Sequence, residues 1–365
     1  MKFTGNTHDI MDGLAIVTRA LLSKPTKQIF EGVHVECDGN TLSLTCSDGT
    51  LSVNWTGNVT VQEPGEAIIQ GKLFSELMRK QKNDTTTISA DSKSATITCG
   101  KSRSRLSVIA GEYPEARTVD NATTFSIPAI AFKDLISHIL PAIATDNSRI
   151  ILTGGLLEVS PDSITAVALD GFRLALKRYQ QDTSTPDKIR TVVPRKTLSE
   201  ISRILPNDDT PVSVSVSTDA IRITVGSTQI TSVLLSGEYL DYSRLIPDYF
   251  ATRVRIKTSD LSDAIDRAGL LAREGKNNLV RLDVHDNTIS VSSRSDTGNI
   301  DEEIDCVQIG NDISIAFNSA YLSEAVRNVP GDSASLNFNS PTTPATISPI
   351  DGNDWIFLVL PVRTF

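Results

Sequence analysis

Residues 73–77 read LFSEL, and a closely similar pattern returns as TLSEI at 197–201 and as YLSEA at 321–325. The two intervals are identical, at 124 residues each. Each copy follows a strand-like run (GEAIIQGK, IRTVVPRK and DISIAFNS) and precedes segments in which apolar and polar residues alternate. Such alternation is typical of half-buried antiparallel strands. The chain is therefore predicted to contain one α+β repeat three times.

The beginning of each repeat recurs as well. THDIMDGLAIVTRALLS (7–23), PAIAFKDLISHILPAIA (128–144) and KTSDLSDAIDRAGLLAR (257–273) carry apolar residues at helical spacing. Two alternating runs follow each segment, separated by Asp-Gly-Asn, Pro-Asp-Ser or Asp-Asn, which favour hairpin turns. A length of 365 residues gives each repeat the size of an ordinary domain. We place the domains at residues 1–122, 123–248 and 249–365.

The composition describes a soluble globular chain. Apolar residues make up 39% of the sequence, and no run approaches the roughly 20 residues that span a bilayer. The opening MKFTGNTHDI lacks the apolar core of a signal peptide, so we expect a cytoplasmic protein without membrane contact. Cys37, Cys46, Cys99 and Cys306 form no metal-binding spacing. They are interpreted as buried thiols, and no metal or cofactor is expected.

The net charge of -9 taken alone argues against a nucleic-acid partner, but the charges are unevenly placed. The segment GKLFSELMRKQK carries Lys72, Arg79, Lys80 and Lys82 against one acid, Glu76. Further basic clusters occur in LLSKPTK and VVPRK, next to predicted helices. If the helices of the three repeats share one side of a curved sheet, their cations act as one surface. A set of ordinary solvated helix faces is the other interpretation.

Signatures of catalysis are weak. The four histidines share no motif, and no G-x-S-x-G elbow, Walker loop or G-x-G-x-x-G turn is present. A hydrolase would require carboxylates from different repeats to converge in one pocket. The phrase AVALDGFRLAL (166–176) is more specific, because it sets Phe172 and Arg173 beside an Asp-Gly turn. Aromatic residues and arginine are the types that dominate interaction hot spots.

Three equal repeats, together with DGFRLAL, VVPRK, GEYLDYSRLIP and the final LVLPVR, resemble the bacterial β sliding clamp family, the processivity subunits of DNA polymerase III. The resemblance covers the whole chain. It implies three clamp-type domains and a head-to-tail homodimer that closes a ring around duplex DNA, with helices lining the hole. It also implies a non-catalytic role as a platform for the polymerase III alpha subunit, the clamp loader complex and other proteins with clamp-binding motifs.

A ring of this kind needs complementary edges at the two ends of the chain. KSRSRLSVI (101–109) contains only basic charges, whereas DTGNIDEEID (296–305) contains only acidic ones, and opposite charges would steer these ends together. Two unrelated solvated charge runs are the other interpretation. The dimer interface implied by charge and by position in the family comprises Arg103, Arg105, Leu106, Val108, Leu270, Leu271, Asp301, Glu302 and Glu303.

The resemblance implies two further sites. The candidate DNA contacts are Lys24, Lys72, Arg149, Arg195 and Lys196, which would bind phosphates without reading sequence. The candidate peptide cleft comprises Leu152, Leu169, Gly171, Phe172, Arg173, Leu174, Leu240, Arg244, Leu245, Leu358, Leu360, Pro361, Val362 and Arg363. The chain departs from many relatives at Phe172, Leu169 and Leu240, where His, Thr and Pro are common, so the cleft is expected to be reshaped.

Two alternatives remain beside the DNA-encircling clamp. A divergent clamp-fold scaffold would keep the cleft and bind peptides without DNA, and it would lack a basic inner surface. An undetected hydrolase is the second alternative. Size in solution and retention on circular as opposed to linear DNA would separate them.

Overall fold

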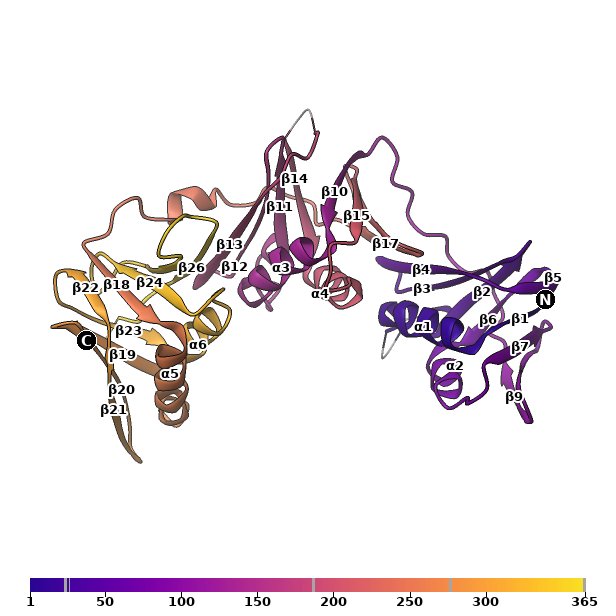
Figure 1. Cartoon of the computed structure of the whole chain (residues 1–365), viewed down its shortest axis with the longest axis horizontal. Coiled ribbons are helices and arrows are strands. Elements are labelled where there is room, and N and C mark those ends of the chain that lie inside the picture. The colour runs from indigo at the N-terminus through magenta and orange to yellow at the C-terminus, as the bar shows by residue number, and fades with distance from the viewer. Residues whose placement is uncertain (23–24, 26, 186–187, 276–277, 364–365) are drawn as a thin grey trace. The chain divides into compact units, whose positions relative to one another are not determined.

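The computed structural model describes residues 1–22, 25, 27–185, 188–275 and 278–363. It confirms a strand-rich α+β fold in which one arrangement of elements occurs three times (Figure 1). The first repeat consists of β1 (Lys2–Asn6), α1 (Thr7–Val17), η1 (Thr18–Ala20), η2 (Gln28–Glu31), β2 (Gly32–Asp38), β3 (Thr41–Ser47), β4 (Leu51–Asn58), β5 (Thr60–Glu63), β6 (Gly65–Gln70), α2 (Gly71–Met78), β7 (Thr85–Ala90), β8 (Ser94–Cys99) and β9 (Ser102–Ser107).

The third repeat has the same order of strands and main helices, and so does the second, except that its described residues form no strand in the place of β5. The second consists of β10 (Thr123–Pro128), α3 (Ala129–Ile139), η3 (Leu140–Ala142), η4 (Ile150–Thr153), β11 (Gly154–Ser160), β12 (Ser163–Leu169), β13 (Arg173–Gln180), β14 (Ile189–Pro194), α4 (Arg195–Ile204), β15 (Pro211–Val216), β16 (Ala220–Val225) and β17 (Thr228–Val233). After η5 (Tyr242–Leu245), the third consists of β18 (Thr252–Lys257), α5 (Thr258–Ala272), β19 (Leu279–His285), β20 (Thr288–Ser295), β21 (Gly298–Asp305), β22 (Val307–Gly310), β23 (Ile313–Asn318), α6 (Ser319–Arg327), β24 (Ser333–Phe338), β25 (Ala345–Ser348) and β26 (Trp355–Val359).

Local chemistry explains where these elements begin and turn. The Asn6 side chain accepts hydrogen bonds from the His8 and Asp9 amides, which caps the start of α1. Asn318 caps α6 in the same way through the Ala320 amide. Between β19 and β20, Asp286 and Asn287 both have positive φ, which two-residue hairpin turns of this kind require. The predicted helices and hairpins are therefore confirmed, although α1 and α3 end before 23 and 144 and continue as short 3-10 turns.

Within the described residues the strands form four antiparallel sheets, two of which cross the limits of the repeats. A five-stranded sheet has the order β5-β1-β7-β8-β9, and a four-stranded sheet has the order β21-β20-β19-β23. An eight-stranded sheet joins repeats 1 and 2 because β17 pairs with β4. A nine-stranded sheet joins repeats 2 and 3 because β26 pairs with β13. At both junctions the last strand of one repeat thus pairs with the equivalent strand of the repeat before it.

This sharing of sheets divides the chain into two compact units. The first unit contains residues 1–133 and 196–235, and the second contains residues 134–195 and 236–365. The middle repeat contributes one sheet to each unit, so its two halves fold against different neighbours. The limits near residues 122 and 248 remain a prediction. They divide the chain by the similarity of its repeats, whereas the compact units divide it by packing.

Each unit has an apolar interior built from inward-facing strand residues and one helix face. The largest fully buried side chains include Phe3 and Phe74 in the first unit and Phe317 and Phe338 in the second. Cys37, Cys46 and Cys99 are buried thiols as predicted, whereas Cys306 is half-exposed.

Gly13 marks the closest approach between α1 and the sheet beneath it. A Cβ atom at this position would lie 2.5 Å from Cε3 of Trp55, so the indole occupies the space that any other residue needs. Gly269 in α5 differs, because the nearest atom to a Cβ there is the Ser319 Oγ at 3.8 Å. Packing against Trp55 therefore requires glycine at position 13, whereas no contact this close requires it at position 269.

We predict that Gly13→Ala and Gly269→Ala change stability in opposite directions. Alanine is favoured over glycine by about 1 kcal/mol in a helix interior, so Gly269→Ala should raise the melting temperature. In Gly13→Ala the clash with Trp55 should outweigh that gain, at a cost of about 1–3 kcal/mol typical of overpacking. Scanning calorimetry of both variants measures this, and a stabilised Gly13→Ala variant would contradict the packing described for α1.

Candidate functional site

The helix side of the first unit carries exposed cations around a cavity of about 570 Å³. Lys72 and Arg79 line it from α2, together with Glu76 and Glu31. Lys72 is exposed at the start of α2, where the helix N-terminus adds its own positive potential. Lys24 lies outside the described residues, although Leu22 and Pro25 line the same cavity.

Arg195 and Lys196 are bound within the chain. The Arg195 guanidinium donates to the carbonyl oxygens of Leu140 at 2.8 Å and Ile143 at 2.9 Å, which holds the start of α4 to the end of α3. The Lys196 ammonium pairs with the Asp48 carboxylate. Burial opposes ionisation of Asp48, but Lys196 and nearby backbone amides hold its pKa below the ordinary value. Both of these predicted DNA-contact residues therefore already have partners within the chain.

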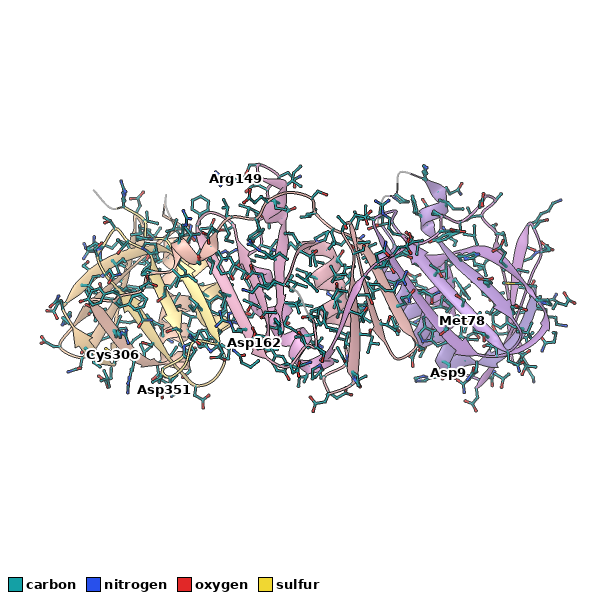
Figure 2. The ribbon with its side chains drawn as sticks, turned by 90° about the horizontal axis from the view of Figure 1, so that it is seen from above. Asp9, Met78, Arg149, Asp162, Cys306 and Asp351 are labelled. Atoms are coloured by element: carbon teal, nitrogen blue, oxygen red, sulfur yellow. The ribbon has the colours of Figure 1, made fainter. Side chains whose placement is uncertain are left out.

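Arg149 is free to reach a partner. It lies at the margin of its unit, in the exposed stretch before η4 (Figure 2). The preceding turn is held by Asp146, whose carboxylate accepts hydrogen bonds from the Ser148 hydroxyl and amide. Those bonds lower the pKa of Asp146, so the carboxylate stays charged beside Arg149.

The predicted interface residues lie on two sheet edges. β9 ends the five-stranded sheet and exposes Arg103 and Arg105 on one face, while Leu106 is buried on the other. Val108 continues this edge with a bridge to Ile69. β21 ends the four-stranded sheet and exposes Asp301 and Glu303.

Glu302 points to the helix side of β21. Arg267 on α5 donates to both of its carboxylate oxygens, at 2.7 and 2.6 Å, and these bonds hold the pKa of Glu302 low. Arg267 was missed in the sequence because a single cation on an amphipathic helix gives no signal of its own. On the same helix Leu270 is 64% exposed and Leu271 is half-buried, so the end of α5 presents apolar surface to solvent.

The predicted peptide cleft centres on the turn between β12 and β13. The Asp170 carboxylate accepts from the Phe172 and Arg173 amides, and Gly171 has a φ of 92°, which favours glycine. The turn presents Phe172 with 56% of its surface exposed. The Phe172 ring stacks on Tyr321 of α6, with the ring centroids 5.7 Å apart.

Arg173 is fixed beside this aromatic pair. Its guanidinium lies 4.6 Å from the Tyr321 ring centroid and forms ion pairs with Asp170 and Glu324. Tyr321 and Glu324 were missed as cleft residues, because the repeated YLSEA pattern in which they occur was interpreted only as a helix. Their place in the triplicated motif was the available signal.

The remaining cleft residues divide by exposure. Leu152, Leu169, Leu174 and Leu358 are almost fully buried and serve the apolar core. Leu240, Leu245 and Leu360 are 37–45% exposed, and the Leu360 amide donates to the Phe172 carbonyl at 2.8 Å. Pro361 and Val362 are half-buried, and Arg363 is exposed. Arg244 is exposed and pairs with Asp241 at 2.8 Å.

All of these cleft residues belong to the second compact unit. They supply exposed apolar groups and arginines around the backbone hydrogen bond between Leu360 and Phe172. This combination of groups suits a peptide ligand.

His138 is a core residue of the same unit. Its ring is buried and stacks on Phe357 with the centroids 4.0 Å apart. Burial, aided by the nearby Lys177 charge, lowers its pKa to about 3, so the imidazole is neutral at ordinary pH. In the part of the chain that the structure describes, no group of three or more His, Cys, Asp or Glu side chains could hold a metal ion. No helix among the same residues is long and apolar enough to cross a membrane.

Comparison with known proteins gives one consistent family. Models of the DNA polymerase III beta subunit match residues 1–117 (N-terminal domain), 126–241 (central domain) and 243–363 (C-terminal domain). The beta sliding clamp of Bacillus subtilis is 30% identical over 100% of both chains, and that of Staphylococcus aureus is 27% identical over the same share.

Solved structures agree over the full length. A Bacillus subtilis DNA polymerase sliding clamp superposes with a TM-score of 0.96 at 29% identity, covering 100% of both chains. A beta subunit from Eubacterium rectale gives a TM-score of 0.95 at 28% identity, covering 99% of both. A Pseudomonas aeruginosa sliding clamp bound to griselimycin gives 0.94 at 25%, covering 100% of both. The chain belongs to the DNA polymerase III beta subunit family, the bacterial sliding clamps.

Proposed function

We propose that two copies of this chain close head to tail into a ring around duplex DNA in the cytoplasm. The ring tethers the replicative polymerase as a processivity factor and performs no catalysis of its own. The observation that carries the proposal is the strand pairing that joins the repeats, because it is used twice within the chain and leaves one matching pair of edges without partners among the described residues. A heterologous contact of this kind closes when its rotation permits.

The repeats can be aligned residue by residue from their helices and antiparallel pairs. The strands β4, β13 and β21 are equivalent, and Val53, Ala175 and Ile300 occupy the same position in them. The last strands of the repeats, β9, β17 and β26, are also equivalent, and Ser104, Ile230 and Phe357 occupy the same position in them. In the two junctions present, Ile230 lies opposite Val53, and Phe357 lies opposite Ala175. The third junction therefore sets Ser104 of one copy opposite Ile300 of the other.

This register brings opposite charges face to face. Moving one residue along each strand sets Arg103 opposite Asp301, and two further residues set Lys101 opposite Glu303. Directly opposed charge pairs stabilise a sheet, and like charges in the same places oppose it. The charges in the sequence suggested that Arg103 and Arg105 would pair with the acids. In this register Arg105 lies opposite Asn299, so Lys101 and not Arg105 forms the second ion pair.

Exposed apolar groups beside these edges support the same contact. Leu73 of α2 is 42% exposed. Its equivalents at the two internal junctions are Thr197, which is 2% exposed, and Tyr321, which stacks on Phe172 of the neighbouring repeat. A second copy would cover Leu73 and the 64% exposed Leu270 in the corresponding way.

DNA would be held by enclosure and by phosphate contacts. Lys72 and Arg149 have exposed side chains suited to phosphate, whereas Arg195 and Lys196 are committed to carbonyls and to Asp48. Contacts to phosphate alone carry no sequence information and let the ring translate along the duplex.

Partner proteins would dock in the cleft around Phe172. We assign to it short segments of the polymerase III alpha subunit, the clamp loader complex and other proteins with clamp-binding motifs. The exposed leucines would receive apolar side chains, and Arg363 would receive carbonyl or carboxylate oxygens, while Arg173 keeps Phe172 and Tyr321 in place.

The enclosure proposal predicts retention that depends on DNA topology. Clamp loaded by its clamp loader onto a nicked circle should stay bound during gel filtration and should leave within minutes when the circle is cut. Catenation in a ring, and not affinity, is the physical reason. Equal loss from circular and linear DNA would contradict the ring and favour the scaffold that binds peptides without DNA.

The strand register predicts a charge-swap result. Arg103→Glu should weaken the dimer by about tenfold or more in sedimentation equilibrium, since it sets two acids opposite each other. The double variant Arg103→Glu with Asp301→Arg should recover most of the affinity. Arg149→Glu, an exposed position in the middle repeat, serves as the control and should leave dimerisation unchanged. Failure of the double variant to recover would argue against this register.

The cleft assignment predicts the effect of removing the Phe172 ring. Griselimycin, which a Pseudomonas aeruginosa relative binds, should bind this chain in isothermal titration calorimetry. Phe172→Ala should weaken binding about tenfold, because an exposed aromatic surface is lost. Ile350→Ala removes an apolar side chain that is 37% exposed in the segment before β26, at the other end of β13 from Phe172, and should have no effect. Unchanged binding by Phe172→Ala would place the ligand elsewhere.

A further inference from the structure

A second exposed patch lies at the margin of the nine-stranded sheet, where β22 flanks β18 (Figure 1). We call it the β18/β22 patch, and it comprises Tyr249, Phe250, Arg253, Arg255, Val307 and Ile309. Tyr249, Val307 and Ile309 are 72%, 55% and 57% exposed. Large apolar groups gathered at a sheet margin need an explanation that scattered ones do not.

The strand register places the patch on one face. Arg253 lies opposite Ile309, and Arg255 lies opposite Val307, so the two cations and the two aliphatic groups point to the same side. Between them Val254 points to the other face, where it is fully buried. The exposed groups are therefore a consequence of a register that the core fixes.

The aromatic part of the patch is held in place. The Arg253 guanidinium lies 5.7 Å from the Phe250 ring centroid. Asn339 donates to the Tyr249 carbonyl at 2.7 Å and accepts from the Ala251 amide at 2.9 Å. An ordered backbone that presents an aromatic ring loses little entropy on binding.

The first repeat contains an internal control. By the alignment of the repeats, Thr60 of β5 takes the place of Val307, and Gln62 and Glu63, which lie at a bulge, share the place of Ile309. Edge strands are normally kept polar in this way, which makes the apolar pair of β22 an exception. Thr60 and Gln62 are exposed although β4 beside them is paired with β17. Closure of the equivalent junction between two copies would therefore leave the β18/β22 patch accessible.

Strand addition is blocked at this edge. The Gln308 amide donates to the Asn287 Oδ1 at 2.9 Å, and the Cys306 amide donates to the Asn287 carbonyl at 2.9 Å. The Gln308 amide, an outward backbone donor of β22, is thus already used, as is the Cys306 amide just before the strand. A partner would bind through side chains on the face of the sheet.

We propose that the β18/β22 patch binds an acidic peptide segment with apolar anchors, at a site separate from the cleft around Phe172. Among the described residues neither Arg253 nor Arg255 has an ion pair, so both can receive carboxylates. Val307, Ile309 and Tyr249 would receive the apolar side chains. A nucleic acid is less suited, because the aliphatic pair offers it neither stacking nor charge.

The test uses the full-length chain and fluorescence anisotropy. The probe is a short labelled peptide in which Asp and Leu alternate, and its counterpart has Lys in place of Asp. We expect the acidic peptide to bind at least about tenfold more tightly than the lysine peptide. The paired variants Arg253→Ser with Arg255→Ser, and Val307→Thr with Ile309→Gln, should each weaken it about tenfold.

The second pair installs the residue types that the first repeat tolerates at the same places, so it should fold. Arg281→Ser with Arg294→Ser removes the same charge from exposed positions on β19 and β20 and should bind like the unaltered chain. Equal affinity for the two peptides, or unchanged binding by both patch variants, would overturn the proposal. Displacement of the peptide by single-stranded oligo-dT would overturn it in favour of nucleic acid. Retention of the patch variants on nicked circles tests the ring separately.

Discussion

The rest of the structure depends on one constraint, that an exposed edge strand of a sheet must be either paired or protected. The chain meets it twice by pairing the last strand of one repeat with an inner strand of the repeat before it, β17 with β4 and β26 with β13. The same two places in the outer repeats, β9 and β21, are left open. In the proposed dimer these two edges would pair as the internal ones do, and their opposite charges would select which ends meet.

Much of this could be predicted from the sequence, because the fold is repeated. The spacing of LFSEL, TLSEI and YLSEA located three helices, and alternation located the hairpins before them. The sharing of the middle repeat between two compact units was not predictable, since strand pairing across repeats leaves no local pattern. Arg267 and Tyr321 were missed for a related reason. Each acts through a contact with a residue distant in sequence, Glu302 or Phe172.

The charges show why a net value of -9 is a poor guide to partners. Two predicted DNA-binding cations, Arg195 and Lys196, have contacts within the chain at the start of α4, while Lys72 and Arg149 are exposed. The cleft places arginine beside an aromatic pair, and the β18/β22 patch places two arginines beside aliphatic groups. Local geometry thus gives an acidic protein three surfaces of different chemistry, of which we propose one for phosphate and two for peptides.

Disulfide cross-linking tests the central claim most directly. In a Cys306→Ser background, Ser104→Cys with Ile300→Cys should form a covalent dimer rapidly under mild oxidation, because the two positions are predicted to lie opposite each other across the subunit junction. Ser104→Cys with Asn299→Cys, which shifts the second cysteine to the other face of β21, should cross-link far more slowly. Equal rates for both pairs, or a product confined to monomers, would contradict an assembly that repeats the internal strand pairing.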